Sequence, residues 1–168
     1  MPPPPELVDS HCHLDFPDFE GAQADLVARA ANEGVTRMVT ICTRLRNEPK
    51  VRAIAEAHPG VFYAAGTHPM HAAEEPMATV KALLALTAHS KFVGIGETGL
   101  DYHYTRESAE VQKESLRIHI AAARESGLPL IIHARAADED MAAILREEYA
   151  NGPYTCVMHC FSSGAALA

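Results

Sequence analysis

Short apolar runs alternate along this chain with longer stretches in which apolar residues recur at helical spacing. Each short run is nearly continuously apolar and rich in β-branched or aromatic residues, which is typical of strands buried on both faces of a parallel sheet. The pattern therefore predicts six strands, at residues 7–8, 38–41, 61–65, 92–95, 128–132 and 156–158.

The intervening stretches predict five helices, at residues 18–32, 47–58, 77–89, 108–125 and 138–149. Asn47 is expected to cap the second helix, with Pro49 in its first turn. Gly34 and Gly127 follow the first and fourth helices, where glycine commonly ends a helix. Residues 162–168 have the pattern of the cap and first turn of a sixth helix.

Strands that alternate with helices imply a parallel sheet, which is either a (β/α)₈ barrel or an open doubly wound sheet. The length of 168 residues leaves room for a sizeable core. Because a natural domain rarely stops one turn into a helix, the pattern predicts that residues 1–168 are a single, incomplete domain.

The composition narrows the class of protein. Hydrophobic residues make up 48% of the chain and charged residues 21%, a balance typical of globular domains. No apolar run approaches the roughly 20 residues of a membrane-spanning helix. The first residues lack the features of a secretory signal, and Pro2–Pro5 predict a stiff, solvated segment. The four scattered cysteines do not indicate a disulfide framework, so these features favour a cytoplasmic protein.

The formal net charge of −8 is the wrong sign for a protein that holds nucleic acid by a broad basic surface. Any activity on nucleic acid must then rest on metal ions and a few local cations. The chain also contains 10 histidines and no tryptophan, so the position of each histidine is informative.

Polar side chains follow almost every predicted strand. In a βα-barrel the carboxyl ends of the strands form the active-site face, so these side chains are expected to converge on one rim. They are His11 and His13 after the first strand, His68 after the third, Glu97 after the fourth, His133 after the fifth and His159 after the sixth.

His11 and His13 lie two residues apart, and residues two apart in a strand project from the same face. They could bind one ion together, whereas the intervening cysteine points the other way. The same argument turns Cys156 and Cys160 away from His159, which predicts thiols packed in the core or behind the sheet rather than zinc ligands. Imidazoles with one carboxylate suit zinc, manganese or cobalt better than a magnesium site made only of oxygen atoms.

Further residues near these strand ends are also candidates. His68 could contact a metal or the substrate, or be a turn residue before a proline. Asp101 could accept a hydrogen bond from a ligand histidine, and Arg135 could pair with a substrate phosphate oxygen or form a surface ion pair. His103 is left open because it closely follows the fourth strand. Four histidines in helix or loop contexts are expected to be structural or solvated: His58, His71, His89 and His119.

Five segments resemble, in order, the signatures of the TatD family of metal-dependent deoxyribonucleases. Each is weak alone, but five in family order across the whole chain are specific. They are LVDSHCHLD at residues 7–15, GTHP at 66–69, GIGETGLDY at 94–102, LPLIIHAR at 128–135 and HCFS at 159–162.

The resemblance implies a TIM-like (β/α)₈ barrel, here truncated to about six strands and five helices, with two divalent ions on its carboxyl rim. His11 and His13 would bind the first ion, Glu97 would bridge both, and His133 and His159 would bind the second. The ions would be zinc, manganese, magnesium or cobalt. The family also has an aspartate in a Glu-Thr-Asp segment near the end of the barrel, to which nothing here corresponds. Without the last two strands, the sheet would keep two exposed edges.

These residues predict a hydrolase that cleaves phosphodiester bonds of DNA, at ends or in single strands, by a two-metal mechanism and without an obligate protein partner. Hydrolysis of an ester or amide, such as an aminoacyl-tRNA, is an alternative because the same rim would serve it. Many binuclear amidohydrolases bridge their metals with a modified lysine, and Glu97 in that place favours the phosphodiester. An alternative of another class is an inactive metal-binding fragment that associates through its open edges.

Overall fold

The computed structural model describes residues 6–168, so the predicted stiff segment at Pro2–Pro5 lies outside the described residues. Six strands form one sheet in the order β1-β2-β3-β4-β5-β6, and every neighbouring pair is parallel. The strands are β1 (Leu7–Cys12), β2 (Val35–Cys42), β3 (Val61–Ala65), β4 (Phe92–Asp101), β5 (Leu130–Arg135) and β6 (Cys156–Met158). The predicted parallel α/β fold is confirmed.

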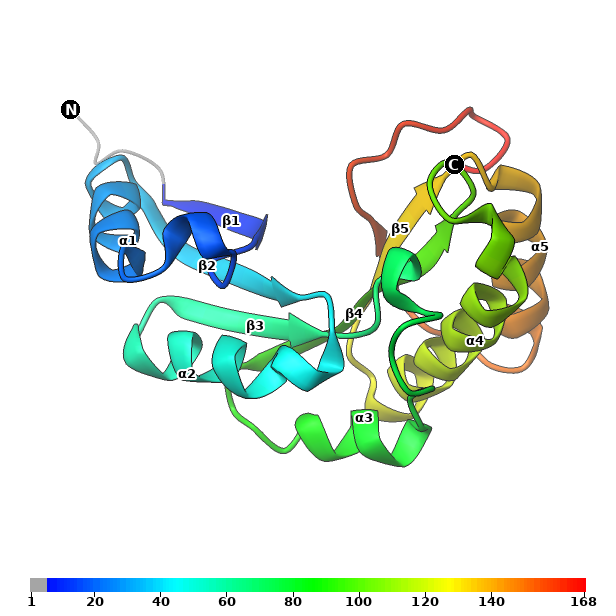
Figure 1. Cartoon of the computed structure of the whole chain (residues 1–168), viewed down its shortest axis with the longest axis horizontal. Helices are drawn as coiled ribbons and strands as arrows, with labels where there is room; N and C mark the ends of the chain where they lie inside the picture. The colour runs from blue at the N-terminus through cyan, green and yellow to red at the C-terminus, as the bar shows by residue number, and fades with distance from the viewer. Residues whose placement is uncertain (1–5) are drawn as a thin grey trace.

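Five helices connect the strands and lie outside the curved sheet, which forms part of a barrel that is open between β1 and β6 (Figure 1). Within residues 6–168 no helix has the length and apolar character needed to cross a membrane. The helices are α1 (Gln23–Asn32), α2 (Glu48–Ala57), α3 (Val80–Leu86), α4 (Ala109–Ser126) and α5 (Asp138–Ala150).

The main core fills the space between the sheet and the helices. Leu83 of α3, Leu116 and Ile120 of α4 and Met141 of α5 are fully buried there against side chains of the strands. A smaller apolar cluster, made of Ile41, Ala64, Ile131 and the partly buried Val39, lies apart from this core. The central strands are therefore covered by apolar contacts on both faces, which explains their nearly continuous apolar sequences.

The two outer strands are less protected than the central ones. Val8 of β1 is 59% exposed and Val157 of β6 is 56% exposed, because each strand has a neighbour on one side only among the described residues. The two exposed edges expected from the sequence are present.

Two elements differ from the predicted bounds in a way that affects the rim. The fourth strand continues to Asp101 because Thr98–Asp101 pair with Ile132–Arg135 of β5, so Glu97 lies inside the strand and not after it. The close approach at Gly99 requires glycine, since its φ is +145° and an added Cβ would lie 1.9 Å from the His133 carbonyl oxygen.

The helix ends account for the other differences. The first predicted helix is split into a 3₁₀ turn at Pro17–Phe19 and α1. The third begins only after Thr79, whose hydroxyl accepts a hydrogen bond from the Ala82 amide. Asn47 does precede α2, but its side chain makes no capping hydrogen bond. Residues 162–168, predicted as the cap and first turn of a helix, have a bend at Ser163 and one hydrogen-bonded turn, in which the Leu167 amide donates to the Gly164 carbonyl oxygen, and no helix is formed there.

Candidate metal centre

The carboxyl ends of the parallel strands bring a group of imidazoles around one carboxylate. Glu97 lies in β4 with 3% of its surface exposed, and the histidines come from four other strands or the residues that directly follow them. Two sets have potential ligand atoms within 4.8 Å of one another: His11, His13 and Glu97, and His68, Glu97 and His133.

The first set uses one oxygen of Glu97. His11 Nε2 is buried and lies 3.2 Å from Glu97 Oε2, but the two atoms are not aligned as a hydrogen bond. His13 Nδ1 lies 3.2 Å from the Ile41 carbonyl oxygen. A carbonyl only accepts, so Nδ1 carries the proton and Nε2 of His13 has its lone pair free. A carboxylate oxygen and two imidazole nitrogens thus face one another as ligands of one ion do.

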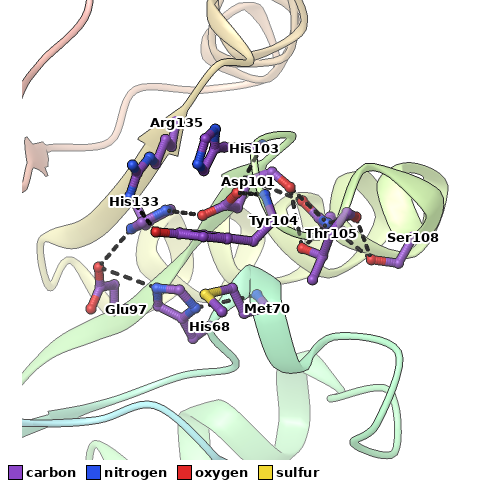
Figure 2. Close-up of polar contacts among 11 residues, drawn as sticks. His68, Met70, Glu97, Asp101, His103, Tyr104, Thr105, Ser108, His133 and Arg135 are labelled. Atoms are coloured by element: carbon purple, nitrogen blue, oxygen red, sulfur yellow. Dashed lines mark hydrogen bonds and ion pairs between the residues drawn. The ribbon is translucent and has the colours of Figure 1, made fainter.

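The second set uses the other oxygen of Glu97 (Figure 2). His133 Nδ1 lies 3.3 Å from Glu97 Oε1, and His68 Nε2 lies 3.7 Å from the same oxygen. Each oxygen of this buried carboxylate therefore faces a different group of imidazoles. This is the arrangement that a carboxylate bridging two ions requires.

Asp101, fully buried at the end of β4, fixes the orientation of His133. Its Oδ2 accepts a hydrogen bond from His133 Nε2 at 2.9 Å, and its Oδ1 accepts from the amides of His103 and Tyr104 at 3.0 and 2.8 Å. With the proton held on Nε2, the lone pair of His133 Nδ1 points toward Glu97. This is the way a carboxylate usually orients a metal-binding histidine.

The hydrogen bonds of His68 lead to a different role. Its Nδ1 accepts from the Met70 amide at 3.2 Å, so in the neutral ring the proton is on Nε2, the nitrogen that faces Glu97. A nitrogen that carries a proton donates a hydrogen bond and cannot bind an ion. His68 is therefore arranged as a donor beside the candidate metal centre.

Burial and close contacts set the charges of this group. Burial raises the pKa of Glu97, but its contacts with His11 and His133 outweigh this and hold the pKa far below its usual range. Burial lowers the pKa of His68 to about 4, so its ring is neutral at neutral pH. For His133, burial lowers the pKa, but contacts with Glu97 and Asp101 raise it above the ordinary value.

His159 directly follows β6 and lies over His11. The two rings are stacked, with centres 3.4 Å apart and planes 5° apart, and the His159 amide donates to the Ile132 carbonyl oxygen. His159 lines the same cavity of about 310 Å³ as Glu97 and His133, although its nitrogens belong to neither set of close ligand atoms. The structure therefore brings all the histidines predicted from the strand ends to one rim.

The donor set fits divalent ions. An ionised buried carboxylate faces an unbonded imidazole nitrogen of His11 and free lone pairs on His13 and His133. Without an ion, the buried Nε2 of His11 makes no well-aligned hydrogen bond, which is costly in a protein interior. Nitrogen donors with one carboxylate suit a borderline ion such as zinc, manganese or cobalt.

Sequence reasoning missed some residues of this cavity. Phe16, Thr43, Met70 and His71 line it together with the predicted residues. Phe16 stacks on His13, with ring centres 4.6 Å apart. His71, which was expected to be structural or solvated, is one of these lining residues. No motif marks these positions, because their places depend on how the loops after β1, β2 and β3 pack.

His119 was predicted to be structural or solvated, and it is fully buried in α4. Its Nε2 accepts a hydrogen bond from the Thr67 amide at 3.1 Å, and its Nδ1 donates to the Ser115 carbonyl oxygen at 2.7 Å. His119 therefore holds the backbone directly before His68.

The cysteines are only partly where they were predicted. Cys42 is buried in the core and Cys12 is half-buried, with its thiol on the Val39 carbonyl oxygen. Cys156 and Cys160 are exposed, so the prediction that they are packed in the core or behind the sheet is wrong. They lie in and after β6, the edge strand, which has no neighbour on its outer side among residues 6–168.

A larger cavity of about 610 Å³ lies beside the start of α5. Two of its three acidic groups already have protein partners, since Asp140 contacts Tyr102 and Lys113, and Asp138 accepts a hydrogen bond from Ser163. The imidazole cluster is therefore the stronger candidate for chemistry.

A family model described as TatD related DNase matches residues 8–168. The chain is 38% identical over 165 residues to YabD of Bacillus subtilis, an uncharacterized metal-dependent hydrolase, covering 96% of this chain and 63% of that protein. It is 29% identical over 156 residues to a Shigella flexneri protein named 3'-5' ssDNA/RNA exonuclease TatD, covering 93% of this chain and 60% of that protein. The crystal structure of the TatD homologue YjjV from Escherichia coli aligns with a TM-score of 0.86 at 30% identity, covering 96% of this chain and 62% of that one. The chain spans about three fifths of the length of these relatives.

Proposed function

We propose, because the chain belongs to the TatD-related DNase family, that its rim of imidazoles around Glu97 is the active site of a metal-dependent phosphodiesterase. The observation that carries the proposal is the position of Glu97, whose two oxygens face separate groups of imidazoles at 3.2 and 3.3 Å. Bound there, two divalent ions would polarise the phosphodiester and activate water for its hydrolysis. Zinc, manganese, cobalt and magnesium are the ions to compare.

We assign the first ion to His11, His13 and Glu97. The second is assigned to Glu97, His133 and His159, as the resemblance implies. His68 Nε2 lies 3.7 Å from Glu97 Oε1. Because this nitrogen carries the proton, we assign His68 as a hydrogen-bond donor to a phosphoryl oxygen and not as a ligand.

Two further residues act around the ions. Asp101 keeps the proton of His133 on Nε2 and so leaves Nδ1 free to bind. Arg135 is exposed beside this site and would pair with a phosphate oxygen of the substrate. In this proposal, side chains of the chain bind and orient the phosphodiester and offset its negative charge, and none of them acts as a nucleophile.

Single-stranded DNA is the proposed substrate. A net charge of −8 disfavours a broad electrostatic grip on a long duplex, so attack at ends or on single strands is favoured. The Shigella flexneri relative, whose name gives it 3'-5' exonuclease activity on single-stranded DNA and RNA, supports this substrate class.

The test is metal analysis of the purified chain, followed by assay on labelled single-stranded DNA with and without a chelator. His133→Ala should lower metal-dependent cleavage by more than the roughly 10–100-fold that loss of an outer hydrogen-bond partner costs. The control is His89→Ala, because His89 pairs at the surface with Glu56. Unchanged nuclease activity in His133→Ala would contradict the proposal.

A second pair of variants separates the roles of two imidazoles. His159→Ala should lower the number of tightly bound ions from two to one, whereas His68→Ala should retain two ions and lower kcat. The reverse result would make His68 the ligand. Cleavage of aminoacyl-tRNA without cleavage of DNA would favour the ester-hydrolase alternative. A chain that binds metal, cleaves neither substrate and self-associates through its β1 and β6 edges would be the inactive metal-binding fragment.

A further inference from the structure

An exposed tyrosine and an exposed arginine lie against each other beside the candidate metal centre (Figure 2). The guanidinium carbon of Arg135 lies 4.7 Å from the centre of the Tyr104 ring, and its Nη1 lies 3.4 Å from the Tyr104 hydroxyl. Arg135 follows His133 by two residues in β5, so both side chains leave the strand on the same face. The pair is therefore placed where a substrate bound at His133 would continue.

The loop that carries Tyr104 is held in place by a buried network. Asp101 Oδ1 accepts from the Tyr104 amide, and its Oδ2 accepts from His133. The fully buried Gln112 donates to the carbonyl oxygen of Thr105 at 2.7 Å. Tyr104, which is 54% exposed, therefore stands on a fixed backbone and loses little conformational entropy when a ligand binds its ring.

The arginine is available to an anion. Among the ion pairs of the part of the chain that the structure describes, Arg135 has no carboxylate partner, whereas Arg44, Arg117 and Arg124 each pair with a glutamate. Proteins that bind single strands combine such local cations with aromatic rings on which bases stack. Because this chain has a net charge of −8 and no general attraction for a nucleic acid, binding of a single strand would depend on such local contacts more than it does in a basic protein.

We propose that Tyr104 and Arg135 form a stacking platform for the base of the nucleotide next to the scissile phosphate in single-stranded DNA. This rests on the proposed nuclease function and deepens it by naming a contact to a base. The base stacks on Tyr104, while the guanidinium of Arg135 pairs with a flanking phosphate. Paired bases in a duplex do not offer a free face, so the platform favours single strands over duplex and tolerates every base.

The test compares a fluorescent oligo(dT) with a strand of equal length made of abasic residues, using the metal-loaded full chain and measuring fluorescence anisotropy and kcat/KM. Tyr104→Leu should weaken binding of oligo(dT) about 10-fold, which corresponds to about 1.4 kcal/mol, and leave binding of the abasic strand unchanged. Tyr104→Phe should retain the affinity of the parent. Tyr149→Leu is the matched control, since Tyr149 is 58% exposed near the end of α5.

The salt dependence separates the two side chains. Arg135→Gln should make the slope of log K against log salt shallower by about 0.7, because one phosphate contact is lost, while Tyr104→Leu should leave the slope unchanged. The platform would be overturned if Tyr104→Leu lowered the affinity for oligo(dT) and for the abasic strand equally, or lowered neither. If the parent chain cleaves no DNA but Tyr104→Leu still weakens oligo(dT) alone, the platform stands and the nuclease function fails. Metal-dependent cleavage with no effect of Tyr104→Leu would overturn the platform and leave the nuclease function standing.

Discussion

Replacing Asp101 by asparagine tests whether the proton on His133 is held where metal binding requires it. Asp101 Oδ1 accepts from two backbone amides, so the asparagine oxygen must stay there and the new NH₂ group must face His133 Nε2. Two donors would then face each other at a distance that is 2.9 Å in the parent. His133 relieves this only by moving its proton to Nδ1, the nitrogen that faces Glu97.

The expected loss follows from this change of tautomer. Nδ1 with a proton has no lone pair for an ion, so the second ion should bind about 10–100-fold more weakly, or about 1.4–2.7 kcal/mol. The first ion should be much less affected, because His11 and His13 do not contact Asp101. The fold should be retained, since asparagine has the shape of aspartate and the two amide contacts persist.

The assay is calorimetric titration of the metal-free chain with zinc or manganese, together with NMR of ¹⁵N-labelled histidine to locate the His133 proton. Asp140→Asn is the control, because it removes the same charge from a carboxylate that contacts Tyr102 and Lys113. If Asp101→Asn binds two ions as tightly as the parent while its proton stays on Nε2, the tautomer argument is refuted.

The remaining predictions concern stability. Gly99→Ala should lower the free energy of unfolding in urea by roughly 2–6 kcal/mol, because it combines a φ of +145° with a Cβ 1.9 Å from the His133 oxygen. Gly127→Ala, with a φ of +73° and no atom within 4 Å of the new Cβ, should cost only about 1 kcal/mol. Burial lowers the pKa of His119 to about 4, so the unfolded chain takes up this proton at higher pH than the folded one. The free energy of unfolding should therefore decrease by about 3 kcal/mol as the pH falls from 6.5 to 4, and His119→Gln should flatten this part of the profile. Lys91→Met should lower the melting temperature and cost about 2 kcal/mol, because the ammonium donates to several backbone carbonyls at and after the end of α2; an unchanged melting temperature would contradict this role.

Much of the fold follows from local patterns in the sequence. Apolar runs of strand length between amphipathic stretches require strands covered on both faces, and this predicted the parallel sheet. The ends of the elements were harder to predict. The fourth strand extends past its apolar residues because Gly99 lets the backbone approach β5, which no periodicity of side chains reveals.

The sequence predicted which histidines and which carboxylate gather at the rim, but neither the other residues that line the cavity nor the inner geometry of the candidate site. Spacing two residues apart placed His11 and His13 on one face, and the strand ends placed Glu97 and His133 on the same rim. Which oxygen of Glu97 faces which imidazole depends on side-chain torsions set by the surrounding packing. The place of His159 over His11 likewise depends on the curvature of the whole sheet (Figure 1), which brings the end of the first strand close to the residues that follow the last one.

The hydrogen bonds around the rim distinguish two imidazoles that the sequence cannot tell apart. His68 and His133 both follow or end a strand, and both lie within 4 Å of the same oxygen of Glu97. The partner on the far side of each ring decides the difference, since Asp101 accepts a proton from His133 and the Met70 amide donates one to His68. An imidazole backed by an acceptor offers a lone pair to an ion, and one backed by a donor offers a proton to the substrate. In the proposed site, the far-side partner, more than proximity to the carboxylate, would therefore determine which imidazole binds metal.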